Sequence, residues 1–187
     1  TVEEQAAQLQ QQAPNIPPEN YILEPMPRGT ASVVGLAAVV LEHRDPQASM
    51  AILTADHFIE NVTAFQQALR TAFQVAQPGY LVTLGIQPTY PATGYGYIQR
   101  GAELPEDVSS AVFRVERFKE KPDEETARQL LAQGDHFWNS GMFVWRTDRI
   151  MDEFQRQMPE LHAKLGEIAS AWDTPEQSSR LGAIWPT

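Results

Sequence analysis

The chain has 187 residues, of which 42% are hydrophobic and 20% are charged, a composition typical of a soluble globular protein rather than a disordered segment. Its 24 acidic residues outnumber the 14 Lys and Arg, which gives a formal net charge of −10. This charge argues against a broad basic surface that binds the phosphate backbone of a nucleic acid. Cysteine is absent, which excludes a disulfide framework, a thiolate nucleophile and a cysteine metal site.

No segment of the sequence looks like a membrane span or a signal peptide. The longest apolar run, residues 33–41, is much shorter than the ~20 residues that a membrane helix needs. The first residues are acidic and then rich in glutamine, unlike a secretory signal. We therefore expect a cytoplasmic protein with no membrane partner. The abrupt start and end lead us to expect part of a longer polypeptide.

Hydrophobic spacing and helix-stop residues predict alternating elements in the first half of the chain. These are a polar surface helix over residues 3–12, a strand over 20–24, a helix over 30–40 capped by Thr30, a buried strand beginning at Met50, and an amphipathic helix over 61–77.

The second half continues the alternation. It is predicted to contain a strand over 80–86, a loop rich in glycine and tyrosine over 87–97, a strand over 111–119, a helix capped by Asp123 that runs to residue 133, an aromatic strand over 136–145, and helices that begin at Thr147, Pro159 and Thr174. Alternating helices and strands favour an α/β fold with a parallel type of sheet, whose ligands bind beyond the carboxyl ends of the strands.

Asp56 follows directly after the buried strand, where its carboxylate is well placed to hold a divalent cation through oxygen. Taken alone, an aspartate there is more often a helix cap or a loop residue. We interpret the neighbouring His57 as a structural residue rather than a general base, and we expect His136 and His162 to lie on the surface.

Polar residues gather at the ends of the predicted strands in four groups. They are Glu24, Arg28 and Thr30; Asp56 and His57; Gly94, Tyr95, Gly96 and Tyr97; and Glu120 and Lys121 with Asn139, Ser140 and Gly141. Each has an ordinary interpretation taken singly: a solvated loop cation, turn glycines, or an exposed ion pair that contributes little. Asn139 is harder to explain this way, because an amide in an apolar strand needs a hydrogen-bond partner.

Together the four groups indicate a site for an anionic ligand rich in hydroxyl groups. Arg28 and the amides at the start of the helix after it suit a base or a phosphate. Gly94 and Gly96 allow the backbone to approach a ligand closely. Glu120 and Asn139 can pair with sugar hydroxyls, and Lys121 and a metal held by Asp56 can bind phosphate.

The order of these motifs resembles that of bacterial mannose-1-phosphate guanylyltransferases, a branch of the sugar nucleotidyltransferase family. The resemblance covers the chain from about residue 18 onward, and the tyrosine–glycine loop and the Trp-Asn-Ser-Gly strand are its most specific parts. The matching segments are Glu24-Pro25, Arg28-Gly29-Thr30-Ala31, Thr54-Ala55-Asp56-His57, Thr83-Leu84-Gly85-Ile86, Thr93-Gly94-Tyr95-Gly96-Tyr97-Ile98, Glu120-Lys121-Pro122 and Trp138-Asn139-Ser140-Gly141-Met142-Phe143.

The resemblance implies a Rossmann-like nucleotide-diphospho-sugar transferase fold with a mixed, mostly parallel sheet flanked by helices. It implies one domain over residues 1–187, in which residues 1–19 form a surface helix and connector and residues 20–187 carry the sheet, the sugar-binding part and the C-terminal helices. It implies that GTP and mannose 1-phosphate react with Mg²⁺ to give GDP-mannose and pyrophosphate, and it leaves a homodimer open.

The resemblance also implies roles for individual residues. Asp56 holds the metal, and Asp56 and Lys121 are the catalytic pair. The nucleotide-binding residues are Glu24, Arg28, Gly29 and Thr30. The sugar-binding residues are Gly94, Tyr95, Gly96, Glu120, Asn139, Ser140 and Gly141.

The sequence departs from the family pattern in three places. The family usually has Asn at the position of Gly29 and Pro at that of Thr54, and no stretch here matches its glycine-rich triphosphate loop. Three alternatives therefore stay open: a nucleotidyltransferase for another base or sugar, a non-catalytic module that binds sugar nucleotides, and an interaction domain without chemistry.

Overall fold

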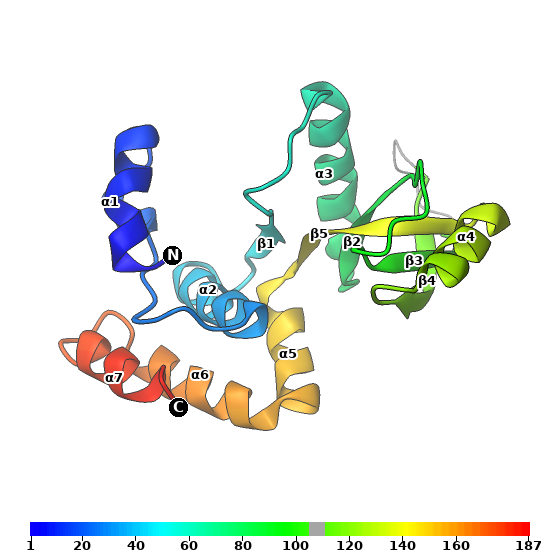
Figure 1. The fold of residues 1–187 in the computed structure, drawn as a ribbon. Helices are drawn as coiled ribbons and strands as arrows, with labels where there is room; N and C mark the ends of the chain where they lie inside the picture. The colour runs from blue at the N-terminus through cyan, green and yellow to red at the C-terminus, as the bar shows by residue number, and fades with distance from the viewer. Residues whose placement is uncertain (105–110) are drawn as a thin grey trace. The chain divides into compact units, whose positions relative to one another are not determined.

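The computed structural model describes residues 1–104 and 111–187, which form two compact units (Figure 1). Unit 1 comprises Thr1–Met50 and Thr147–Thr187, and unit 2 comprises Ala51–Arg146. Each unit has hydrophobic clusters of its own. The expectation of one domain over residues 1–187 stays a prediction.

Unit 1 is helical. Its elements are α1 (Glu3–Gln12), the 3₁₀ turn η1 (Pro18–Asn20), α2 (Thr30–Arg44), α5 (Thr147–Gln157), α6 (Pro159–Ala171) and α7 (Gln177–Ile184). Helix α2 is apolar around most of its circumference, which suits a helix that packs against both α5 and α6. The core cluster of unit 1 contains Leu36, Ile168, Leu181 and Trp185.

Two details of the predicted N-terminal region are wrong. Residues 20–24 form no strand: η1 occupies the first of them, and Glu24 makes only an isolated bridge with Val2. Prolines on both sides of this segment lack the N–H that a sheet partner would need. Thr30 is the first helical residue rather than the cap, which is Gly29, and α2 continues to Arg44 because apolar residues continue through Leu41.

An added methyl group should have opposite effects on stability at two glycines of unit 1. A Cβ at Gly35 of α2 would lie 2.4 Å from Cδ1 of Leu165, which is only 1% exposed and has little room to move, whereas a Cβ at Gly166 of α6 meets nothing within 4 Å. We expect Gly35→Ala to lower the free energy of unfolding by about 1–3 kcal/mol through overpacking. Gly166→Ala should raise it by about 0.5–1 kcal/mol through helix propensity. Urea denaturation of the two variants measures both, and equal effects would contradict the packing described.

Unit 2 contains a sheet and two helices. The helices are α3 (Val62–Ala76) and α4 (Glu124–Gln133), and the strands are β2 (Val82–Ile86), β3 (Tyr97–Glu103), β4 (Phe113–Lys119) and β5 (His136–Arg146). With β1 (Ser49–Ile52), the strand order is β1-β5-β3-β4, and β2 also pairs with β5. Helix α3 packs against β2 and β5, and α4 lies beside β5 (Figure 1).

The α/β class is confirmed, but the mostly parallel sheet is wrong for the pairings β2–β5, β3–β4 and β3–β5, which are all antiparallel. A helix between two strands suggested parallel crossovers. Helix α4 instead joins β4 to β5, and β5 pairs with β3. Strand β3 was not predicted, because its polar residues and Gly101 hide any clear alternation.

Helix α4 begins and ends as the sequence predicts. The Asp123 carboxylate accepts a hydrogen bond from the backbone N–H of Thr126 at 2.8 Å, and Gly134 ends the helix with φ of 73°. The Thr126 hydrogen bonds lower the pKa of Asp123 below its ordinary 3.8. The cap is therefore at full strength above the ordinary pKa and weakens as the pH falls through the lower, folded value.

We expect Asp123→Ala to lower the Tm by about 2–4 °C at pH 7. Asp123→Asn should retain most of the stability, because the amide oxygen still accepts the hydrogen bond. The Tm difference between wild type and Asp123→Ala should narrow as the pH falls below 3.8. Thermal melts between pH 7 and pH 2 check this, and a difference that widens on acidification would contradict the cap.

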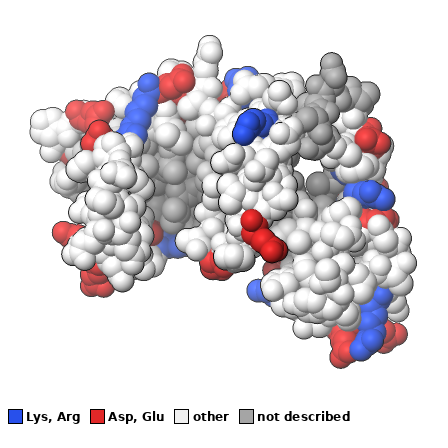
Figure 2. All heavy atoms as spheres, turned by 90° about the horizontal axis from the view of Figure 1, so that it is seen from above, with Lys and Arg blue, Asp and Glu red and all other residues white. Residues whose placement is uncertain are grey.

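The surface matches the composition. Among the described residues, no helix is both long and apolar enough to cross a membrane. On the face that Figure 2 shows, Lys and Arg side chains stand apart and several lie beside Asp or Glu, so the described part of this face carries no continuous basic patch.

Candidate functional site

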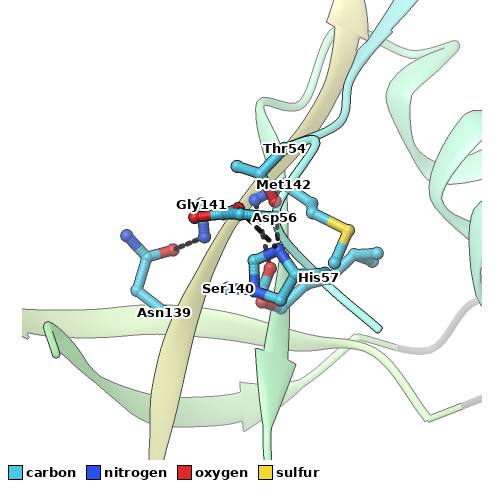
Figure 3. A network of polar contacts seen from close by, with 8 residues as sticks. Thr54, Asp56, His57, Asn139, Ser140, Gly141 and Met142 are labelled. Atoms are coloured by element: carbon cyan, nitrogen blue, oxygen red, sulfur yellow. Dashed lines mark hydrogen bonds and ion pairs between the residues drawn. The ribbon is translucent and has the colours of Figure 1, made fainter. Parts of the chain in front are cut away.

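Asn139 and Ser140, two of the predicted sugar-binding residues, directly precede Gly141, where the backbone of β5 leaves the extended conformation; this point is called the bend (Figure 3). Gly141 has φ of 72°, a conformation that residues with a Cβ rarely adopt. The Asn139 side-chain oxygen accepts hydrogen bonds from the Thr83 hydroxyl at 3.1 Å and the Gly141 N–H at 3.3 Å. The Ser140 hydroxyl donates to the Leu84 carbonyl at 2.7 Å and accepts from the Met142 N–H at 3.1 Å. Ser140 is thus occupied with the backbone. The described residues leave the Asn139 amide nitrogen free to donate to a ligand.

The tyrosine–glycine loop meets this bend at Gly96. The Gly96 carbonyl accepts a hydrogen bond from the Asn139 N–H at 2.8 Å. A Cβ at Gly96 would lie 2.7 Å from Oε2 of Glu120 and 3.6 Å from Cβ of Asn139. A methyl group at this position would therefore push the Glu120 carboxylate away from the loop. Because the Glu120 side chain is 71% exposed, its carboxylate can still reach a ligand.

Lys121 has an unusual backbone conformation, with φ of 39°. This conformation costs about 1–3 kcal/mol for a residue with a Cβ, and such strain clusters at functional sites. Its Nζ lies 3.8 Å from Oε1 of Glu120, and the two side chains are 66% and 71% exposed. An ion pair this exposed is weak, so the ammonium can turn to a phosphate at little cost.

Asp56 lies in a turn beside β5 (Figure 3). Its side chain is 89% exposed, and its Oδ1 is 3.6 Å from Nδ1 of His57. The Thr54 hydroxyl also contacts Nδ1 of His57. The Thr54 methyl group would be 3.4 Å from a Cβ at Gly141, which places the turn against the bend. These contacts are local to the turn, and the structural role expected of His57 stays a prediction.

The described residues hold no group of three or more His, Asp or Glu that could bind a metal together. Asp56 therefore offers one exposed carboxylate rather than a cage. Magnesium commonly binds proteins through one or two carboxylates and completes its shell with water and substrate phosphates, so a single open carboxylate fits this ion.

The predicted nucleotide-binding residues all lie in unit 1. The Glu24 carboxylate accepts a hydrogen bond from the Arg28 N–H at 3.2 Å, and the Arg28 guanidinium donates to the Pro186 carbonyl at 2.9 Å. A Cβ at Gly29 would meet nothing within 4 Å. Thr30 is the first residue of α2, whose N-terminal N–H groups can bind an anion.

Histidine positions were predicted less well. His136 is buried, with only 5% of its side chain exposed, so the prediction that it lies on the surface is wrong. Its Nδ1 is 2.6 Å from the Asp135 carboxylate. A hydrogen bond from the Gln99 amide, together with this contact, lowers the pKa of Asp135. The alternating burial of β5 puts His136 on the same buried face as Trp138 and Ser140.

Comparison with protein families decides the class. A family model described as nucleotidyl transferase matches residues 1–185. This chain belongs to the nucleotidyl transferase family. The resemblance seen in its motifs is confirmed at that level.

Among curated relatives of this nucleotidyl transferase chain is "Mannose-1-phosphate guanylyltransferase ManC" of Salmonella typhimurium, which is 46% identical over 147 residues. That match covers 78% of this chain and 31% of the relative. The chain thus spans about a third of the length of the relative, which is consistent with the expectation of part of a longer polypeptide.

Two solved structures share the fold. A structure described as "mannose-1-phosphate geranyltransferase" from Thermus thermophilus has a TM-score of 0.84 and 29% identity, and the match covers 100% of this chain and 50% of that one. Mannose-6-phosphate isomerase from Helicobacter pylori has a TM-score of 0.74 and 26% identity, with 91% and 63% covered. These matches confirm the sugar nucleotidyltransferase fold class.

Two residues with a part in the site's geometry were not assigned one from the sequence. Thr83 holds the Asn139 side-chain oxygen, and Trp138 packs against Tyr95 with ring centroids 5.2 Å apart. Both lie in motifs that carried the resemblance. The sequence shows that Thr83 and Trp138 match the family pattern, but it does not show which side chains they contact.

Proposed function

We propose that this chain is part of an enzyme that forms GDP-mannose and pyrophosphate from GTP and mannose 1-phosphate. The observation that carries the proposal is the meeting of the Gly96 backbone with Glu120 and Asn139 in unit 2. These groups offer a carboxylate that accepts and an amide that donates, which suits vicinal sugar hydroxyls. The 46% identity to the Salmonella guanylyltransferase names the reaction to test.

In this proposal, Glu120 and Asn139 bind the mannose hydroxyls. Gly94, Tyr95 and Gly96 border the sugar with backbone that approaches closely. Ser140 and Gly141 hold the backbone beside Asn139 in place: the Ser140 hydroxyl donates to the Leu84 carbonyl and accepts from the Met142 N–H. Lys121 contacts the sugar phosphate, and its strained backbone holds it next to Glu120.

Asp56 is the residue proposed to hold Mg²⁺. Its exposed carboxylate would supply one ligand, and the coordination shell would be left open to substrate phosphates and water. When bound, the ion neutralises the charge that develops on the phosphate oxygens. His57 and Thr54 hold the turn in which Asp56 lies.

The nucleotide is proposed to contact Glu24, Arg28, Gly29 and Thr30 of unit 1. The guanidinium of Arg28 suits the base or a phosphate, and the first N–H groups of α2 suit a phosphate. The side chain of Glu24 steadies the segment through the Arg28 N–H. Gly29 has no side chain that could recognise the base, and no atom lies within 4 Å of where its Cβ would be, so other groups must recognise the base.

The proposed reaction is an in-line displacement. An oxygen of mannose 1-phosphate attacks the α-phosphorus of GTP, and the bond from that phosphorus to the bridging oxygen of pyrophosphate breaks. The protein contributes positioning and charge neutralisation. Lys121 lowers the repulsion between the sugar phosphate and the triphosphate. We further propose a cytoplasmic location with no nucleic-acid or membrane partner, and the homodimer stays an open expectation.

Pyrophosphate release by the full-length gene product tests the proposal. The assay uses GTP, ATP, CTP and UTP, each with mannose 1-phosphate, glucose 1-phosphate and N-acetylglucosamine 1-phosphate. We expect the highest kcat/KM for GTP with mannose 1-phosphate. A preference for another pair would reassign the base or sugar, and no turnover with any pair would favour a non-catalytic module.

A further inference from the structure

Trp138 is a buried side chain to which the proposed reaction assigns no role. It is 9% exposed, and its indole N–H has no hydrogen-bond acceptor among the described residues. Its neighbours in the core cluster of unit 2 are Ala92, Tyr97, Ala127 and Leu130. Neighbouring side chains of a strand point to opposite faces, so Trp138 faces away from Asn139 and the ligand groups beside it.

Two tyrosines of the loop pack on the Trp138 ring. Tyr90 and Tyr95 make edge contacts with centroid distances of 5.0 and 5.2 Å and interplanar angles of 66° and 68°. Such edge-to-face pairs are favourable beyond the area they bury. A hydrogen bond with the Tyr95 side chain also raises the pKa of Tyr90.

Two hydrogen bonds also hold the loop over residues 90–96 against strands β3 and β5. The buried Tyr97 hydroxyl donates to the Ala92 carbonyl at 2.9 Å. The Asn139 N–H donates to the Gly96 carbonyl at 2.8 Å, next to where the Glu120 carboxylate lies. The position of Gly96 relative to Glu120 therefore depends on where the Tyr90–Tyr95 segment packs.

We propose that Tyr90, Tyr95 and Trp138 form an aromatic clamp that holds the 90–96 loop in the conformation that binds the sugar phosphate. Trp138 is thus a positioning residue that acts through Tyr95 and Gly96. Tyr90 and Tyr95 are 51% and 47% exposed, so each contacts the buried Trp138 ring and is also partly open to solvent. The inference rests on the proposed function for the identity of the ligand only, because the clamp itself is a feature of unit 2.

The chain supplies a matched control on the same strand. Trp145 is 7% exposed, its indole N–H also lacks an acceptor in the described part of the chain, and it stacks on Phe143 rather than on the loop. Trp138→Leu and Trp145→Leu remove the same atoms from similarly buried sites. Both should lower stability by similar amounts.

The first measurement is hydrogen–deuterium exchange of the full-length protein without substrate. We expect the amides of residues 90–97 to exchange faster in Trp138→Leu than in wild type, and at the wild-type rate in Trp145→Leu. Trp138→Phe, which keeps a ring beneath the tyrosines, should restore most of the protection. If Trp138→Leu does not fold, Tyr95→Leu makes the same test. Unchanged exchange in the folded variant would overturn the clamp.

The second measurement is the KM for each substrate. We expect Trp138→Leu to raise the KM for mannose 1-phosphate about 10- to 100-fold, as displaced positioning groups do, and to leave that for GTP within a factor of about two. Trp145→Leu should change neither. Equal changes for both substrates would overturn the link to sugar recognition. If wild type turns over no substrate pair, the proposed function fails, and the exchange data still decide whether the clamp exists.

Discussion

Asp56→Ala is expected to lower the Mg²⁺-dependent kcat/KM of the full-length protein by about 10²–10³-fold. A loss of this size is typical when an enzyme loses one group that stabilises the charge developing in the transition state. The fold should be unaffected, because the Asp56 side chain is 89% exposed and its contact with His57 is local to one turn. Steady-state pyrophosphate release at several Mg²⁺ concentrations measures the effect, and a thermal melt checks the fold.

Asp152→Ala is the matched control for Asp56. Asp152 is also exposed and also pairs with a neighbour, Arg149, but it lies on helix α5. Its replacement should leave kcat/KM and the Mg²⁺ dependence unchanged. An Asp56→Ala enzyme with the wild-type Mg²⁺ dependence would show that the metal is held elsewhere.

Gly96→Ala should have the largest effect on sugar binding. The new methyl group would lie 2.7 Å from Oε2 of Glu120, so the carboxylate must move away from the loop. We expect the KM for mannose 1-phosphate to rise about 100-fold, since a displacement of about 1 Å can cost that much, while the KM for GTP changes little. Initial rates with each substrate varied in turn measure both constants.

Two other glycines separate the causes of the Gly96 effect. Gly94→Ala meets no atom within 4 Å, so it tests only the approach of the backbone to the ligand. Gly166→Ala, on helix α6 of unit 1, also meets nothing and should leave both KM values unchanged. A Gly96→Ala enzyme with a normal KM for mannose 1-phosphate would contradict the assignment of Glu120 to the sugar.

The sequence predicted the helices best because their start and stop signals are local. Asp123 and Gly134 bound α4 as expected, and Asn61 caps α3 through the Ala64 N–H at 3.0 Å. These signals act within a few residues of one another, so they can be read without knowing the rest of the fold.

The sheet was predicted less well because strand pairing is not local. The apolar run that starts at Met50 and the aromatic run that starts at His136 were both recognised as strands, as β1 and β5 confirm. Their directions and partners depend on connections that the pattern does not encode. The antiparallel pairings of β5 with β2 and β3 therefore emerged only from the structure.

The candidate site was predicted as a set of residues but not as an arrangement. The structure brings Gly96, Glu120 and Asn139 together, and it places Asp56 beside Gly141 through Thr54. The close approach of Gly96 to Glu120 could not be foreseen, because it joins residues 24 positions apart along the chain.

The most direct test of the account is a calorimetric titration of the full-length protein with GDP-mannose, with and without Mg²⁺, and with ADP-glucose as the control ligand. We expect GDP-mannose to bind at least tenfold more tightly than ADP-glucose, which corresponds to about 1.4 kcal/mol. We also expect Gly96→Ala to weaken this binding and Gly166→Ala to leave it unchanged. Equal affinity for the two ligands, or no binding of GDP-mannose, would contradict the account.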